Sequence, residues 1–261
     1  MTHRREPAVA GLFYPLDAEE LRYELDRFLS LAPDSPLTPK AMIVPHAGYA
    51  YSGAIAASAY AQLAKIAPQI TQVALFGPSH RVPLRGLAIC NAEQFLTPLG
   101  PVGVDLARCQ QLMQFPQVSI MDEAHAQEHS LEVQLPFLQT VLKDFKLIPI
   151  VVGDASAEQV CEVMEYLWQQ PGMLIIVSSD LSHYHDYHTA QQLDQQTTDA
   201  IEHLRPDQIG YEQACGRNPV NGLLLLAQHQ HLQASTLDLR NSGDTSGARD
   251  RVVGYGAYVF H

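Results

Sequence analysis

Three short apolar runs that each lead into a histidine-bearing turn constrain the fold more than any other feature of this sequence. The runs and their histidines are residues 41–45 with His46, residues 72–76 with His80, and residues 173–177 with His183. A continuous apolar run of this length, bounded by turn residues, is typical of a strand buried in a parallel sheet. Ligands of open α/β sheets bind outside the carboxyl ends of the strands. The pattern therefore predicts one shared site at one edge of a sheet.

Amphipathic helical segments alternate with apolar runs along most of the chain. We expect helices over residues 17–32, 52–66, 105–115, 128–138, 156–169, 189–204 and 219–231, and further strands over residues 86–90, 146–152, 236–240 and 252–260. Ser130 is expected to cap the fourth of these helices, and Pro136 to kink it. Alternating strands and helices indicate an α/β fold. We therefore predict a single domain over residues 1–261, with a central mixed, mainly parallel sheet flanked by helices.

The composition argues against several classes of protein. The chain has 261 residues, of which 46% are hydrophobic and 17% charged, enough apolar material for a packed core. Its formal net charge is -12 and its basic residues do not cluster, which argues against a nucleic-acid partner. No apolar run approaches the roughly 20 residues that span a bilayer, and the charged N-terminus lacks the apolar core of a signal peptide. We therefore expect a cytoplasmic protein without a membrane partner.

His46, His80 and Cys215 are candidate metal ligands. Histidine is the commonest metal ligand in proteins, and a turn at a strand end fixes the ring while leaving it accessible. Cys215 lies just before a helix N-terminus, where the pKa of a thiol is lowered. Two histidines and one anionic residue resemble the facial triad of non-haem Fe(II), with a thiolate in place of the carboxylate. The alternative is that all three are ordinary packed or exposed residues.

Four further residues are candidates for the same pocket. His183 is a candidate acid/base, and Asp180 would orient either His183 or a ligating histidine, although Asp180 and Ser182 could instead serve as helix caps. His129 and Glu132 are three residues apart at the start of a predicted helix, so they would share one face of it. They would either line the pocket or cap the helix.

Six motifs in the same order resemble the Memo (mediator of cell motility) family over nearly the full chain. The motifs are residues 8–15 (AVAGLFYP), 45–49 (PHAGY), 77–80 (GPSH), 128–132 (EHSLE), 178–183 (SSDLSH) and 215–216 (CG). Each motif is short, but the ordered set is specific. The chain also resembles the Memo component of the AmmeMemoRadiSam system, which implies a radical-SAM protein as a partner.

The resemblance implies a fold similar to class III extradiol dioxygenases, which open catechol rings with non-haem Fe(II). It matches His46 and His80 to the two histidine ligands, and Cys215 to the third ligand, where the dioxygenases have glutamate. His183 matches the acid/base position and Asp180 its neighbour. The resemblance also implies Fe(II) as the metal, with copper or zinc as alternatives. Tyr49, in the 45–49 motif, is a further candidate for the pocket lining beside His129 and Glu132.

Three functions follow from this resemblance. The first is a metal-binding, redox-active protein with a His/His/Cys site. The second is a dioxygenase-type enzyme that acts on a small aromatic molecule. The third is a non-catalytic peptide-binding or scaffold protein that retains a relic of the site. A thiolate next to Fe(II) is itself oxidisable, which favours the first function over the second.

Overall fold

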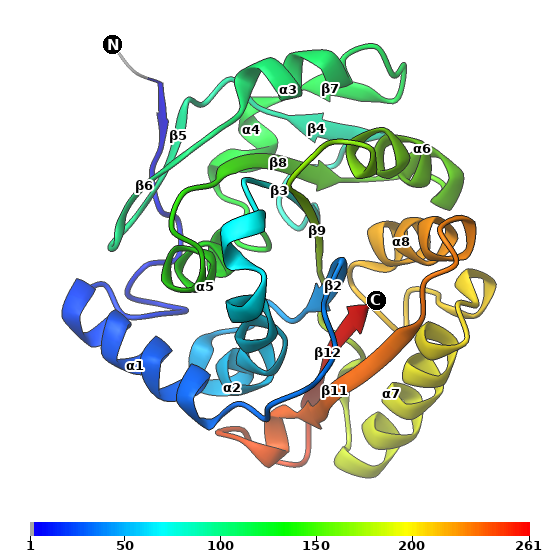
Figure 1. The fold of residues 1–261 in the computed structure, drawn as a ribbon. Helices are drawn as coiled ribbons and strands as arrows, with labels where there is room; N and C mark the ends of the chain where they lie inside the picture. The colour runs from blue at the N-terminus through cyan, green and yellow to red at the C-terminus, as the bar shows by residue number, and fades with distance from the viewer. Residues whose placement is uncertain (1–2) are drawn as a thin grey trace.

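A nine-stranded mixed sheet forms the centre of the computed structural model, which describes residues 3–261 (Figure 1). Its four central strands run parallel in the order β2-β9-β3-β8, and they are β2 (Ala41–Val44), β9 (Met173–Ser178), β3 (Gln72–Pro78) and β8 (Lys146–Val152). All four residues of β2 are buried, as are most residues of the other three strands. A parallel sheet covered on both faces accounts for the unbroken apolar runs in the sequence.

Antiparallel pairings extend this centre on both sides. Beyond β2 lie β12 (Val252–Phe260), β11 (Ala234–Asn241) and β10 (His183–His185), and beyond β8 lies β4 (Leu87–Ile89), with which the outermost strand β7 (Val118–Ile120) pairs in parallel. A separate three-stranded sheet contains β1 (Arg4–Arg5), β5 (Gln94–Thr97) and β6 (Gly100–Gly103). The predicted fold class, an α/β domain with a central mixed sheet, is confirmed.

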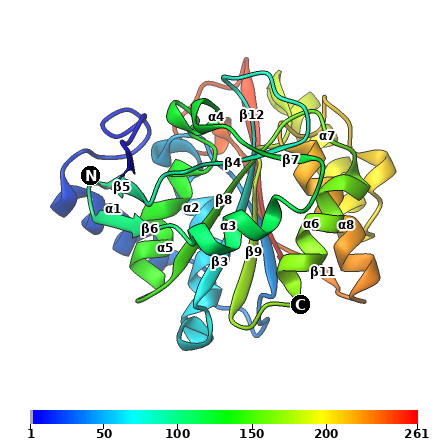
Figure 2. The same ribbon diagram turned by 90° about the horizontal axis from the view of Figure 1, so that it is seen from above.

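Helices cover both faces of the central sheet (Figures 1 and 2). One layer contains α1 (Ala18–Leu31), α2 (Tyr49–Tyr60) and α5 (Leu135–Val141), and the other contains α6 (Ala157–Trp168), α7 (Tyr187–Glu202) and α8 (Arg217–His229). Two short helices, α3 (Leu106–Leu112) and α4 (Asp122–Ala126), lie near β4 and β7. Among the helices of residues 3–261, none combines the length and apolar character that a membrane crossing requires.

Local sequence signals set several helix boundaries. The side chain of Asp17 accepts hydrogen bonds from the backbone of the first turn of α1, and Ser156 forms a capping box with Gln159 at the start of α6. Short 3-10 segments connect other elements: η1 (Ala61–Lys65), η2 (Ala67–Gln69), η3 (Glu132–Gln134), η4 (Pro206–Gln208) and η5 (Ser242–Asp244).

The segment 128–138 differs from the single kinked helix that we expected. Residues 128–131 are not helical, and the helix α5 begins only at Leu135, after the 3-10 segment η3. Pro136 therefore lies in the first turn of α5, where its missing N–H breaks no hydrogen bond and causes no kink. Ser130 caps nothing, because its hydroxyl donates to the carbonyl of Pro78.

Candidate metal centre

His46, His80 and Cys215 come together at the carboxyl edge of the parallel strands. His46 follows β2 and His80 follows β3, while β9 lies between these two strands and Cys215 lies two residues before the start of α8. One possible ligand atom from each residue lies within 4.8 Å of the other two. The Sγ of Cys215 is 3.3 Å from the Nε2 of His46, and the ring centroids of His46 and His80 are 5.1 Å apart. The predicted convergence of these residues is confirmed.

Hydrogen bonds fix both the position and the tautomer of His46. Its backbone N–H donates to the Oδ1 of Asp180 at 2.7 Å, and its Nδ1 lies 3.0 Å from the Oγ of Ser178. The Ser178 hydroxyl donates its only proton to the Ser130 carbonyl and accepts from the Gln134 amide. Ser178 can therefore only accept from His46, so Nδ1 carries the proton and the Nε2 lone pair faces Cys215.

Burial also keeps the His46 ring neutral. The residue is 2% exposed. Desolvation, reinforced by the neighbouring imidazoles of His80 and His129, holds the pKa of His46 well below its ordinary value. A neutral imidazole with a directed lone pair is the form that binds a metal ion.

Glu128, which the sequence reasoning did not single out, holds His80. Its carboxylate accepts from the backbone N–H of His80 at 2.6 Å, lies 2.9 Å from the ring Nδ1, and accepts from the backbone N–H of Ser130 at 2.9 Å. Burial alone would raise the pKa of Glu128, but the hydrogen bonds from His80 and Ser130 oppose burial, and the pKa is about 2. The ionised carboxylate can only accept, so Nδ1 of His80 donates and Nε2 is left for an ion.

Cys215 is held by the backbone that follows β9. Its N–H donates to the carbonyl of Asp180 at 3.3 Å, and its Sγ accepts from the Asp180 N–H at 3.3 Å. The next residue, Gly216, packs so closely that a Cβ there would lie 2.7 Å from the Cβ of Ser179. Burial, with the nearby Asp180 charge, raises the pKa of Cys215 to about 12. Our expectation of a lowered pKa is therefore wrong, because the burial of the thiol raises its pKa.

Comparison with known proteins identifies the family. The family described as Memo-like protein matches residues 5–259. The chain belongs to this family. It is 35% identical to a MEMO1 family protein of Aquifex aeolicus and 36% identical to one of Methanosarcina mazei, and each match covers 98% of both chains. It also resembles a crystal structure of the uncharacterized protein JW3007 from Escherichia coli K12, at 13% identity. That match has a TM-score of 0.52 and covers 84% of this chain and 98% of the other, which shows a shared fold.

His129 joins the cluster in this Memo-like chain, as the sequence suggested. Its ring stacks on that of His80, with centroids 4.7 Å apart and planes 20° apart. Its Nδ1 is buried without a hydrogen-bond partner among the described residues and lies 3.5 Å from the Oε1 of Glu128. His80, Glu128 and His129 thus form a second possible ligand group that shares His80 with the first.

Glu132 and Tyr49 do not face the cluster, contrary to our prediction. The Glu132 carboxylate pairs with the Arg5 guanidinium and accepts from the Tyr14 hydroxyl. It also accepts from the backbone N–H groups of residues 8 and 9. The Tyr49 hydroxyl donates to the Val133 carbonyl at 2.7 Å. Because no helix runs through residues 129–131, His129 and Glu132 point to different places, and Glu132 anchors the N-terminal segment instead.

Asp180 and His183 lie beside the cluster. Neither caps a helix, because Asp186 caps α7. The Nδ1 of His183 lies 2.8 Å from the Leu181 carbonyl, which can only accept, so this nitrogen carries the proton and Nε2 keeps its lone pair. Burial raises the pKa of the Asp180 carboxyl, although the hydrogen bond that it accepts from the backbone N–H of His46 works in the opposite direction. The acid/base role of His183 and the orienting role of Asp180 stay predictions.

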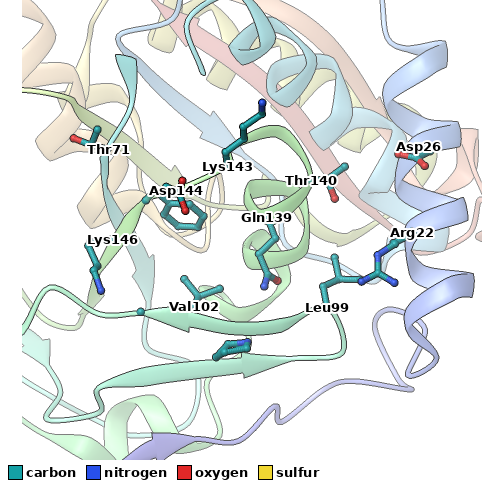
Figure 3. Close-up of a pocket in the computed structure, with 13 residues that line it drawn as sticks. Arg22, Asp26, Thr71, Leu99, Val102, Gln139, Thr140, Lys143, Asp144 and Lys146 are labelled. Atoms are coloured by element: carbon teal, nitrogen blue, oxygen red, sulfur yellow. The ribbon is translucent and has the colours of Figure 1, made fainter. Parts of the chain in front are cut away.

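Two cavities differ in their relation to this centre. A cavity of about 300 Å³ is lined by Cys215 together with Ser79 and Arg217, so it adjoins the cluster. A larger cavity of about 690 Å³, shown in Figure 3, is lined by residues such as Gln139 and Lys146 and contains none of the candidate ligands. Lys146 begins β8, so this larger cavity lies at the amino end of that strand. We therefore associate the smaller cavity with the metal centre.

The donor set fits a transition metal. Two imidazole Nε2 atoms and one thiol suit iron, copper or zinc, whereas magnesium and calcium prefer oxygen ligands. The fixed tautomers leave both lone pairs free of protein hydrogen bonds among residues 3–261, apart from the contact between His46 and Cys215. The thiol must lose its proton when an ion binds.

Proposed function

We propose that this chain is a metal-binding protein whose ion is held by His46, His80 and Cys215, with Fe(II) as the preferred ion and copper or zinc as alternatives. One observation carries the proposal. The hydrogen bonds of Ser178 and Glu128 leave Nε2 of both imidazoles available to an ion, and one ligand atom each from His46, His80 and Cys215 lies within 4.8 Å of the others. Orienting partners of this kind are the usual support of metal-ligating histidines.

A bound Fe(II) would supply one-electron redox chemistry and an open position for an external ligand. The protein contributes the rest. Glu128 and Ser178 keep the two rings in place, and the backbone of Asp180 fixes the thiol. The thiol of Cys215 is a site of oxidation next to a redox metal, which is why we propose redox activity. The adjoining cavity of about 300 Å³ has room for a small ligand.

A dioxygenase-type enzyme is the second candidate, and the tautomer of His183 favours it. Because Nδ1 is committed to the Leu181 carbonyl, Nε2 can take a proton from a substrate hydroxyl. In this candidate His183 is the base and Asp180 orients it. A peptide ligand and a radical-SAM partner protein stay predictions from the family resemblance.

Metal reconstitution without oxygen tests the proposal. The purified protein is loaded separately with Fe(II), copper and zinc, and retained metal is measured after gel filtration. His46→Ala and Cys215→Ser should each lower the metal content by one equivalent. The matched controls Cys109→Ser and His203→Ala should not, because Cys109 is a buried thiol in α3 and His203 is exposed. Unchanged content in Cys215→Ser would overturn the proposal.

Oxygen uptake with a panel of catechols then separates the two candidates. The Fe(II)-loaded protein is mixed with each catechol, and oxygen consumption and ring-opened product are followed. Turnover that disappears in His183→Ala, with metal retained, supports the enzyme. Tight Fe(II) binding without turnover of any catechol supports the metal-binding, redox protein.

A further inference from the structure

A second group of metal-ligating side chains lies between α6 and α8, apart from the centre described above. Cys161 and Glu165 are four residues apart on α6, so they share one face of that helix, and His229 is the last residue of α8. The Nδ1 of His229 lies 2.7 Å from the Oε1 of Glu165 and 3.9 Å from the Sγ of Cys161. The three ligand atoms all lie within 4.8 Å of one another.

The packing of the two helices fixes this group. At Gly222 on α8, a Cβ would come within 2.5 Å of the Val160 side chain on α6, so the helices approach closely there. Cys161 is buried in the resulting contact, whereas the side chains of Glu165 and His229 are 38% and 54% exposed. The thiol is therefore held by the core, while the other two groups remain open to solvent and free to adjust.

We propose that Cys161, Glu165 and His229 form a second site for a zinc-like divalent cation. Zinc binds sulfur at about 2.3 Å and nitrogen or oxygen at about 2.0–2.2 Å. Tetrahedral ligands at these bond lengths are roughly 3.3–3.6 Å apart. The distance from sulfur to nitrogen must shorten by a few tenths of an ångström and that from nitrogen to oxygen must lengthen, which rotation of the two exposed side chains allows.

The chemistry of the group selects the class of ion. Sulfur, nitrogen and oxygen donors together suit zinc or cobalt(II), and a fourth position is left for water. Glu158 adds negative charge near the Cys161 thiol. The ion would tie α6 to the C-terminal end of α8, and Cys215 lies two residues before the other end of this helix. The alternative is that His229 and Glu165 form only an ion pair, with Cys161 as a neighbour.

Cobalt(II) titration distinguishes these alternatives. The full-length Cys215→Ser protein, which lacks the thiol of the first site, is titrated with Co(II) without oxygen. We expect a near-ultraviolet band from sulfur to cobalt and a visible spectrum of tetrahedral intensity. Both signals should disappear in Cys215→Ser proteins that also carry Cys161→Ser, and weaken strongly with His229→Ala or Glu165→Gln. The controls Glu162→Gln and His203→Ala should keep both signals.

The outcome is readable even if one variant folds poorly. Cys161 is buried, so its replacement can disturb packing, but Glu165 and His229 are partly exposed and their variants should keep the melting temperature of the metal-free protein. Absence of the sulfur band in the Cys215→Ser protein would overturn the proposal. So would a band that survives both His229→Ala and Glu165→Gln. Neither result depends on whether the first site binds an ion.

Discussion

Replacing Glu128 by glutamine should weaken both the fold and the metal centre. Glu128 is 2% exposed, and its carboxylate accepts from two backbone N–H groups and from the ring of His80. Glutamine keeps the size of the side chain but loses the charge. One of its two polar atoms becomes a donor, and this donor would face groups that also donate.

The pKa of Glu128 gives the size of the expected loss of folding stability. The value falls from 4.5 to about 2, the net result of burial, which raises it, and of the His80 and backbone contacts, which lower it. This drop corresponds to about 3 kcal/mol of stability. Because the folded pKa is depressed, the contribution is fully present above about pH 4.5 and is lost as the pH falls towards 2. We therefore expect Glu128→Gln to lower the free energy of unfolding at pH 7 by about 3 kcal/mol.

Urea unfolding and metal competition measure the two effects. Loss of an orienting partner typically lowers metal affinity by about 10–100-fold, so Glu128→Gln should bind Fe(II) or zinc at the first site correspondingly more weakly. Glu123→Gln is the matched control, because Glu123 is exposed in the same segment. If Glu128→Gln matched this control in both stability and affinity, Glu128 would not support His80 as described.

Three further predictions follow from the same contacts. Because burial raises the pKa of Cys215 to about 12, the thiol must release one proton when an ion binds at the first site. Metal affinity there should therefore fall about tenfold for each unit by which the pH is lowered. Cys215→Ser should remove this pH dependence, whereas Cys161→Ser should not. If the protein is an enzyme, His183→Ala should lower turnover by about 10²–10⁴-fold while the metal stays bound, and Asp180→Asn should lower turnover less. If His183→Ala instead loses the metal at unchanged stability, His183 is a metal ligand and not the acid/base. Burial raises the pKa of Asp194 from 3.8 to about 6, so the stability of the folded state falls as the pH rises between these values. In urea titrations, Asp194→Asn should therefore raise the free energy of unfolding by up to about 3 kcal/mol at pH 7 but not at pH 3. Equal effects at the two pH values would contradict this role of Asp194.

The central strands and two of the three ligands could be predicted because each depends on local sequence. The unbroken apolar runs of β2, β3 and β9 are short and bounded by turn residues, which is typical of strands buried on both faces. Since the carboxyl ends of parallel strands lie at one edge of a sheet, His46 and His80 were expected to lie close together there. Cys215 follows no strand. Its position before a helix made it a candidate, and the family resemblance matched it to the third ligand. The helix position alone predicted a lowered thiol pKa and could not show the burial that raises it.

The parts that were missed depend on tertiary contacts. β5, β6, β7 and β10 have three or four residues each, too few for a periodic pattern to show. Glu128 and Glu132 occur in one short motif and look alike in sequence. The structure separates them because the chain between them is not helical, so that one holds His80 and the other pairs with Arg5. No spacing rule distinguishes the two carboxylates.

X-ray absorption at the metal edge tests the central claim most directly. The measurement uses the His229→Ala protein loaded with one equivalent of Fe(II), so that the proposed second site does not contribute. We predict one sulfur at about 2.3 Å together with imidazole nitrogens at about 2.0–2.1 Å. The sulfur contribution should be absent when Cys215→Ser is added. A shell of nitrogen and oxygen only, unchanged by Cys215→Ser, would contradict the account.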